Sequence, residues 1–112
     1  MVVEVVDMRE RDIEKKLVRE VRRMGGEAYK WTSPGNDGVP DRIVMFPGGR
    51  VVFVELKADG GALRPVQRIQ IEKIRKLGQS VEVVKGRLEL ERFLRREAAN
   101  EVHTTRIPEA GD

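Results

Sequence analysis

Apolar residues recur at helical spacing in three parts of the chain. The three expected helices are residues 8–24, 65–77 and 87–98. In the first helix, Ile13, Leu17 and Val21 fall on one stripe, and Asp7 precedes them as the expected N-cap. The second begins at Pro65, a residue favoured in the first turn of a helix. Each pattern predicts an amphipathic helix packed on a core.

Four shorter segments are dominated by apolar residues and are predicted to be strands. They are residues 27–31, 41–46, 51–57 and 81–84. Residues 47–50 (Pro-Gly-Gly-Arg) predict a hairpin between the second and third strands, and the turn-forming residues 32–40 predict a loop before them. Residues 2–6 are also apolar and form either a short strand or a loose arm. The order αβββαβα predicts an α/β fold in which helices flank a mixed sheet.

The length of 112 residues predicts one domain, which we expect to span residues 1–98. The helical pattern fades after that point, so residues 99–112 are expected to form a flexible tail. No apolar run approaches the ~18 residues that would predict a membrane span. The first residues also lack the features of a secretory signal, and we therefore expect an intracellular, cytoplasmic protein with no membrane partner.

Composition restricts the chemistry that the chain can perform. There is no cysteine, which excludes thiolate metal ligands, and the single histidine, His103, excludes a multi-histidine site. The net charge is +3, but residues 97–112 carry four acids and one arginine, which leaves +6 on residues 1–96. The positive charge of residues 1–96 fits binding to a polyanionic partner, but it is equally compatible with an ordinary solvated surface. The basic clusters on the expected helices, open to both interpretations, are Arg19, Arg22, Arg23, Arg64, Arg68, Lys73, Arg75 and Lys76.

Charged residues interrupt the apolar third strand at its end. Glu55 and Lys57 alternate with Leu56, so they share one face of the strand, about 7 Å apart. Taken alone, this pair is an ion pair at the end of a strand. The hairpin adds Asp41, which is opposite Glu55 if the loop has three residues and opposite Leu56 if it has two. Two opposed carboxylates ~5 Å apart repel, and the pairing favours a cation between them.

The three-residue loop makes two further demands. Gly49 must adopt a left-handed backbone conformation, and Phe46 must pair with Arg50. Glu14 and Gln67 also lie inside the apolar stripes of the first and second helices, where a polar side chain needs a partner. Each could have one local hydrogen bond, but both stripes face the sheet that carries Asp41.

These residues resemble a known family. Gly38-Val-Pro-Asp41, then Val54-Glu55-Leu-Lys57-Ala58 and then Gln67 are similar to the motifs of the VRR-NUC (virus-type replication-repair nuclease) domain, a branch of the PD-(D/E)xK nuclease superfamily. The resemblance covers roughly residues 8–86. It implies a restriction-endonuclease-like αβββαβ core, to which this chain adds a C-terminal helix.

The resemblance also implies roles for individual residues. Asp41 and Glu55 match the metal-binding carboxylates, and the backbone carbonyl of Leu56 matches a further oxygen ligand. Lys57 matches the lysine that positions or activates the attacking water. Glu14 matches an acid on the first helix that reaches the metal directly or through water, and Gln67 matches the glutamine of the next helix. The implied metal is Mg²⁺, for which Mn²⁺ can substitute, because hard cations take oxygen ligands and keep several waters.

The expected function is therefore that of a metal-dependent DNA endonuclease. Resemblance to stand-alone members of the family implies a phage or prokaryotic homodimer that acts on branched DNA, such as four-way (Holliday) junctions, in DNA repair. The expected dimer surfaces are the arm 2–6 and the last helix. The alternatives are a non-catalytic nucleic-acid-binding or assembly module and, less well supported, a hydrolase of small phosphoesters. A pair of repulsive carboxylates favours the enzyme, because a binding module has no use for it.

Overall fold

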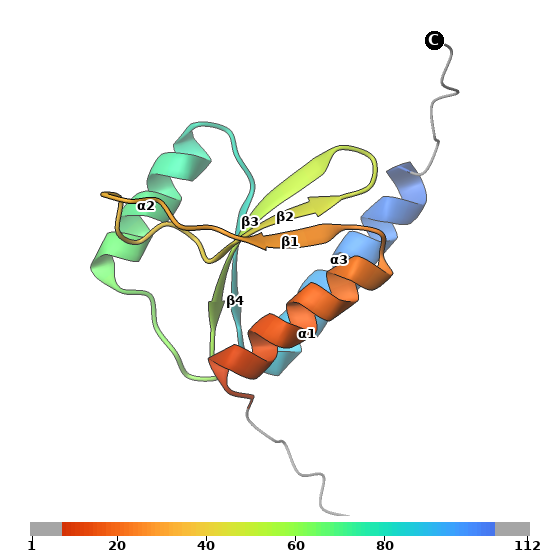
Figure 1. Ribbon diagram of the computed structural model, residues 1–112, viewed down its shortest axis with the longest axis horizontal. Coiled ribbons are helices and arrows are strands. Elements are labelled where there is room, and N and C mark those ends of the chain that lie inside the picture. Colours follow the sequence, from red (N-terminus) through yellow and green to blue (C-terminus); the bar gives the residue numbers. More distant parts are fainter. Residues whose placement is uncertain (1–7, 105–112) are drawn as a thin grey trace, which may run out of the picture.

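The computed structural model describes residues 8–104, and it describes the side chains of residues 8–100. Its elements follow the predicted order (Figure 1). They are α1 (Glu10–Arg23), β1 (Glu27–Lys30), β2 (Arg42–Phe46), β3 (Arg50–Lys57), α2 (Pro65–Lys76), β4 (Val81–Lys85) and α3 (Gly86–Thr104). No helix within residues 8–104 is long and apolar enough to cross a membrane.

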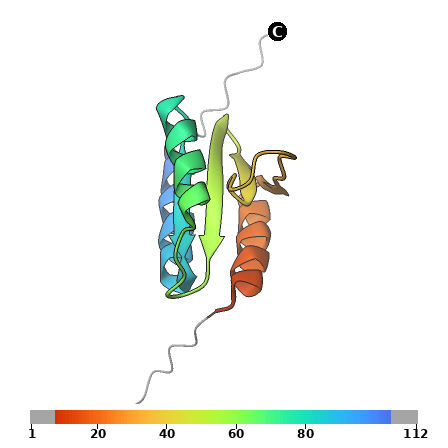
Figure 2. The ribbon, with the colours of Figure 1, turned by 90° about the vertical axis from the view of Figure 1, so that its left-hand side faces the viewer.

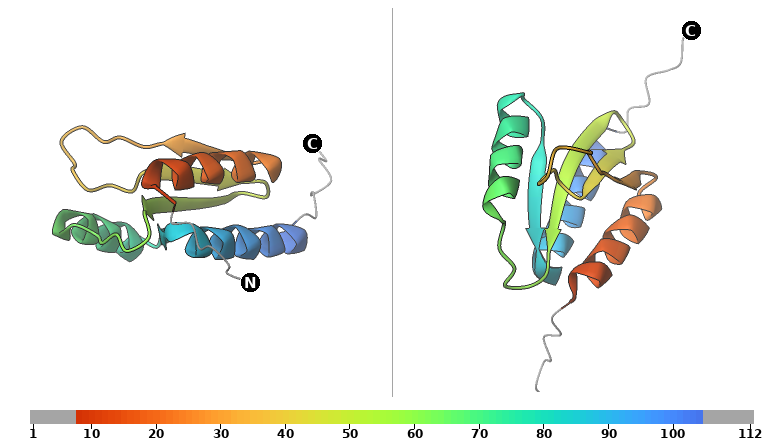
Figure 3. Two further views of the ribbon diagram at one scale, coloured as in Figure 1. Left: turned by 90° about the horizontal axis from the view of Figure 1, so that it is seen from below. Right: turned by 60° about the vertical axis from the view of Figure 1, so that its left-hand side comes forward.

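The four strands form one mixed sheet in the order β1-β2-β3-β4. The first three strands are antiparallel neighbours, and β4 pairs parallel to β3 after the crossover through α2. Helices α1 and α3 contact each other on one face of this sheet, and α2 packs on the other. Strand β3 lies between α1 and α2 in Figure 2 and in the right-hand view of Figure 3. This arrangement confirms the predicted α/β class and the mixed sheet.

Each face of the sheet has its own apolar cluster. Along β3, Val52 and Val54 are fully buried against α1 and α3, whereas Phe53 faces the smaller cluster under α2. The predicted stripe of α1 lies in the larger cluster, because its residues recur once per turn. Two buried faces explain why the strands are apolar nearly throughout.

Two predicted helix ends lie two or more residues from their place in the structure, whereas the other predicted bounds lie within one residue of it. The N-cap of α1 is Arg9, not Asp7, which lies outside the described residues. Helix α3 continues to Thr104, six residues beyond the predicted end and into the predicted tail. Glu97, 2% exposed, accepts hydrogen bonds from Arg50 of the hairpin at 2.6 and 2.8 Å, which holds this part of α3 against β3. The arm 2–6 and the rest of the tail, 105–112, lie outside the described residues.

Candidate active site

The β2–β3 hairpin brings Asp41 opposite Glu55. Phe46 pairs with Arg50, and Arg42, the first residue of β2, pairs with Val54, so that the next opposed positions are Asp41 and Glu55. Gly49 has φ +92°, as a three-residue loop requires. The structure thus confirms the predicted register, and the two-residue alternative was wrong. The backbone N–H of Leu56 also donates to Asp41 Oδ2 at 2.9 Å, which fixes this carboxylate at the end of the strand.

Glu55 is a buried acid whose surroundings disfavour the charged carboxylate form. Its side chain is 1% exposed; Oε2 accepts a hydrogen bond from Gln67 Nε2 at 2.9 Å and lies 3.5 Å from Lys57 Nζ. Oε1 is buried without a hydrogen-bond partner among the described residues. Burial, followed by the negative charge of Asp41, raises the pKa of Glu55 to about 7, although Lys57 opposes the shift. An unpartnered oxygen beside a second carboxylate is an arrangement that a cation would stabilise.

Gln67 connects Glu55 to the start of α2. Its side-chain oxygen accepts a hydrogen bond from the backbone N–H of Arg64 at 2.8 Å, as the N3 residue of a capping box does. Its amide nitrogen donates to Glu55, so both ends of the amide are fixed. The predicted position of Gln67 beside the site is confirmed.

The loop before Asp41 lies against the same helix end. Gly38 has φ +92°, and a Cβ atom at this position would lie 2.7 Å from the backbone oxygen of Val66. Only glycine fits both the conformation and the contact. The close approach explains the glycine of the Gly38-Val-Pro-Asp41 motif, whose contact could not be read from the sequence.

Glu14 does not point toward Asp41 and Glu55, as was expected, and its predicted contact with the metal, direct or through water, stays a prediction. Its Oε1 accepts hydrogen bonds from Arg42 Nε at 3.0 Å and Nη2 at 2.6 Å. Arg42 alternates with Asp41 along the chain and therefore faces the α1 side of the sheet. The acid in the apolar stripe does have a partner, as burial requires, but this partner is an arginine.

Glu10, one turn before Glu14, is the acid of α1 whose charge reaches the site. Its charge contributes to raising the pKa of Glu55, after the larger effects of burial and Asp41. Sequence reasoning missed it because an acid in the first turn is expected at any helix start. The available signal was its position one turn before Glu14, on the same side of the helix.

The residues present fit a hard divalent cation. Among the described side chains, residues 8–100, no group of three or more acidic, histidine or cysteine side chains could hold a metal. Asp41 and Glu55 supply two carboxylates, and the strand between Glu55 and Lys57 carries the Leu56 carbonyl. Mg²⁺ is commonly bound through one or two carboxylates together with water and substrate phosphate. This donor set, with its unpartnered buried oxygen, therefore suits Mg²⁺ better than a metal that needs a full cage of protein ligands.

Three comparisons identify relatives of the chain. The model of the VRR-NUC domain family matches residues 3–88. A relative, "Putative nuclease p44" of Acyrthosiphon pisum secondary endosymbiont phage 1, is 49% identical over 77 residues, 69% of this chain and 83% of the relative. A solved structure described as a VRR_NUC domain is 27% identical, with a TM-score of 0.66 over 86% of this chain and 96% of that one. The chain belongs to the VRR-NUC domain family, which confirms the resemblance and identifies it as a nuclease domain.

Proposed function

We propose that this chain is a Mg²⁺-dependent endodeoxyribonuclease that hydrolyses phosphodiester bonds at the site around Asp41, Glu55 and Lys57. The observation that carries the proposal is the buried Glu55 carboxylate, which has an unpartnered Oε1 and lies beside a second carboxylate. A fold selected only for binding has no reason to keep two repelling acids at one edge of its sheet.

The residues divide the work as follows. Asp41, Glu55 and the Leu56 carbonyl would hold Mg²⁺, and Gln67 keeps the Glu55 carboxylate in place. When bound, Mg²⁺ polarises the phosphodiester and lowers the pKa of a bound water. The ammonium group of Lys57, 3.5 Å from Glu55 Oε2, supplies positive charge where the transition state gathers negative charge. The charge of Glu10 adds to the negative potential that attracts the cation.

The direct test is cleavage of labelled linear, flap and four-way-junction DNA in Mg²⁺, Mn²⁺, Ca²⁺ or EDTA. We expect cleavage in Mg²⁺ and Mn²⁺ and none in EDTA. Binding of DNA without cleavage in any metal would favour the non-catalytic module. Hydrolysis of small phosphodiesters but of no DNA would favour the phosphoester hydrolase.

We also propose that the protein acts as a homodimer on branched DNA, in a repair or recombination process. Two sites related by a two-fold axis suit the symmetry of a four-way junction, and two-fold dimers are the commonest homo-oligomers. The phage relative supports the expected phage or prokaryotic origin and an intracellular place of action. Sedimentation that shows only monomers at micromolar concentration, or equal cleavage of linear and junction DNA, would contradict this part of the proposal.

A further inference from the structure

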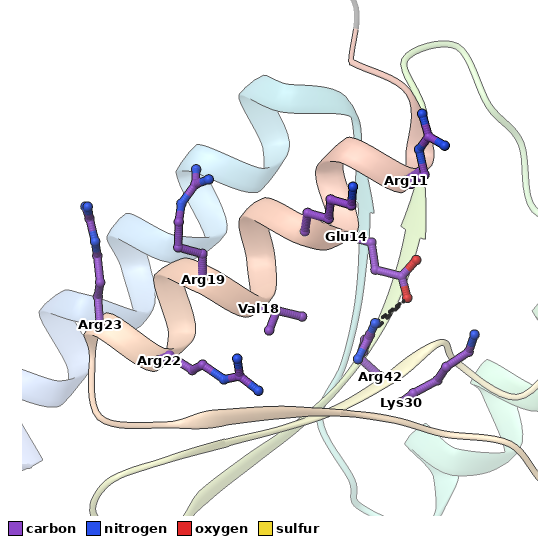
Figure 4. Close-up of a pocket in the computed structure, with 9 residues that line it drawn as sticks. Arg11, Glu14, Val18, Arg19, Arg22, Arg23, Lys30 and Arg42 are labelled. Carbon is purple, nitrogen blue, oxygen red and sulfur yellow. Dashed lines mark hydrogen bonds and ion pairs between the residues drawn. The ribbon is translucent and has the colours of Figure 1, made fainter.

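A strongly basic groove runs between α1 and the strands β1 and β2. Its volume is about 710 Å³, and seven of the nine side chains that line it are cations (Figure 4). The other two are Val18 and Glu14, and Glu14 is already paired with Arg42. The groove is separate from the cluster around Glu55, which lies on the α2 face of the sheet.

The cations follow one face of α1. Arg11, Lys15, Arg19 and Arg22 recur once per turn, so the row extends about 16 Å along the helix axis. Lys30, which pairs with Arg42 in the sheet, lies across the groove from this row (Figure 4). Phosphates follow one another about every 3.4 Å along the axis on one strand of a duplex, so the row can face several of them.

Most of this positive charge is not neutralised within the protein. Arg11, Lys15 and Lys30 form no ion pair with the described side chains of residues 8–100. Arg19 and Arg22 have acidic neighbours, but these contacts are 3.6 and 3.4 Å long and exposed to water. Exposed pairs of this kind compensate charge only weakly. The groove therefore attracts an extended polyanion.

The groove begins next to the candidate active site. Arg42 lines the groove and directly follows Asp41 in the chain, and the two face opposite sides of the sheet. Arg11 lines it too and directly follows Glu10, whose charge reaches Glu55. The groove and the carboxylates therefore meet at neighbouring positions at the start of β2 and at the N-terminal end of α1.

We propose that this groove binds the phosphate backbone of the substrate nucleic acid beside the bond that is cut. This inference rests on the proposed function. The described lining side chains include no aromatic residue on which a base could stack, so the contact is with phosphates and independent of base sequence. The groove would then hold one arm of the substrate while the acidic site cleaves.

The test compares two triple variants that remove the same charge. The groove variant is Arg11→Ala/Lys15→Ala/Lys30→Ala, and the control, on exposed residues of α2 and α3, is Lys73→Ala/Lys76→Ala/Arg95→Ala. Fluorescence anisotropy measures binding of a labelled DNA duplex in EDTA between 50 and 200 mM salt. We expect the groove variant to lose at least ~10-fold in affinity and its salt slope to fall by about 2–3, with the control within about 2-fold of wild type. Thermal melting checks that both variants are folded.

Other outcomes decide against the groove. Equal losses in both variants would overturn the proposal, because only net charge would matter. Binding of poly-glutamate that depends on the three groove cations, with unchanged DNA affinity, would assign the groove to an acidic protein. Hydrolysis of thymidine 5′-p-nitrophenyl phosphate, too short to fill the groove, should be unchanged in the groove variant. If wild type hydrolyses no phosphodiester at all, the proposed function fails, but the anisotropy measurement still tests whether the groove binds DNA.

Discussion

Replacing Glu55 by glutamine should remove the pH dependence that this residue imposes on the free energy of unfolding. Its pKa is raised from the ordinary 4.5 to about 7, first by burial and then by the charge of Asp41. The folded protein therefore binds this proton more tightly than the unfolded chain does. The resulting stabilisation is fully present below pH 4.5 and is lost as the pH rises through 7.

The magnitude follows from the two pKa values. Their difference corresponds to about 3 kcal/mol in total, of which about 2.5 kcal/mol is lost between pH 5 and pH 8. Glutamine keeps the shape and can still accept the hydrogen bond from Gln67, but it does not ionise. Burying an amide group at the unpartnered Oε1 position lowers the free energy of unfolding, but by the same amount at every pH. This constant cancels when the two proteins are compared across pH.

The assay is urea unfolding of wild type and Glu55→Gln in EDTA at pH 5, 6.5 and 8. The stability of the variant relative to wild type should rise by about 2.5 kcal/mol from pH 5 to pH 8, whereas the exposed control Glu72→Gln should show no such trend. Excess Mg²⁺ at pH 8 should stabilise wild type and not the variant. If the free energies of unfolding of wild type and Glu55→Gln change with pH in the same way across this range, the reasoning is refuted.

Three further changes test the site. Lys57→Ala should lower the cleavage rate ~10²–10³-fold with DNA affinity nearly unchanged, measured in single-turnover and anisotropy assays; wild-type cleavage in Mg²⁺ would refute its role. Asp41→Asn should abolish cleavage but leave the metal-free protein at least as stable as wild type in urea unfolding. The amide oxygen can still accept the hydrogen bond from the Leu56 N–H, and the repulsion with Glu55 is gone. Marked destabilisation would mean that Asp41 is a structural cap. Gly38→Ala should lower the free energy of unfolding by about 2–4 kcal/mol and reduce the cleavage rate, because its Cβ would meet the Val66 backbone. The control Gly35→Ala, at positive φ but in open space, should lower it by only about 1 kcal/mol. Equal losses of stability in the two variants would exclude the close contact.

The fold could be predicted from the sequence because local signals and global topology agree. The stripe of α1, the proline at the start of α2 and the glycines of the hairpin each act over a few residues. The hairpin register also depends only on loop length, so the opposition of Asp41 and Glu55 could be derived by counting. The end of α3 could not be, because Glu97 is fixed by Arg50, 47 residues earlier in the chain.

The site was predicted where geometry is local and missed where it depends on a third element. Asp41, Glu55 and Lys57 lie on one hairpin, and Gln67 follows on the next helix. The choice between Glu10 and Glu14 depends instead on how α1 is positioned against the sheet. An acid in an apolar stripe needs a partner, and the pattern along α1 alone gives no sign that Arg42 supplies it.

The pleat of β2 explains how one small sheet can serve two purposes. Asp41 and Arg42 are neighbours in the chain but face opposite sides, so the acidic site and the basic groove meet at the start of β2. A slip of one residue in the hairpin would exchange the two faces and put Arg42 beside Glu55. The three-residue turn therefore does more than close the hairpin, because its length keeps Asp41 on the face of Glu55 and Arg42 on the face of the groove. Selection on this turn should act through cleavage and DNA binding together, although neither the glycines nor the turn contacts either site.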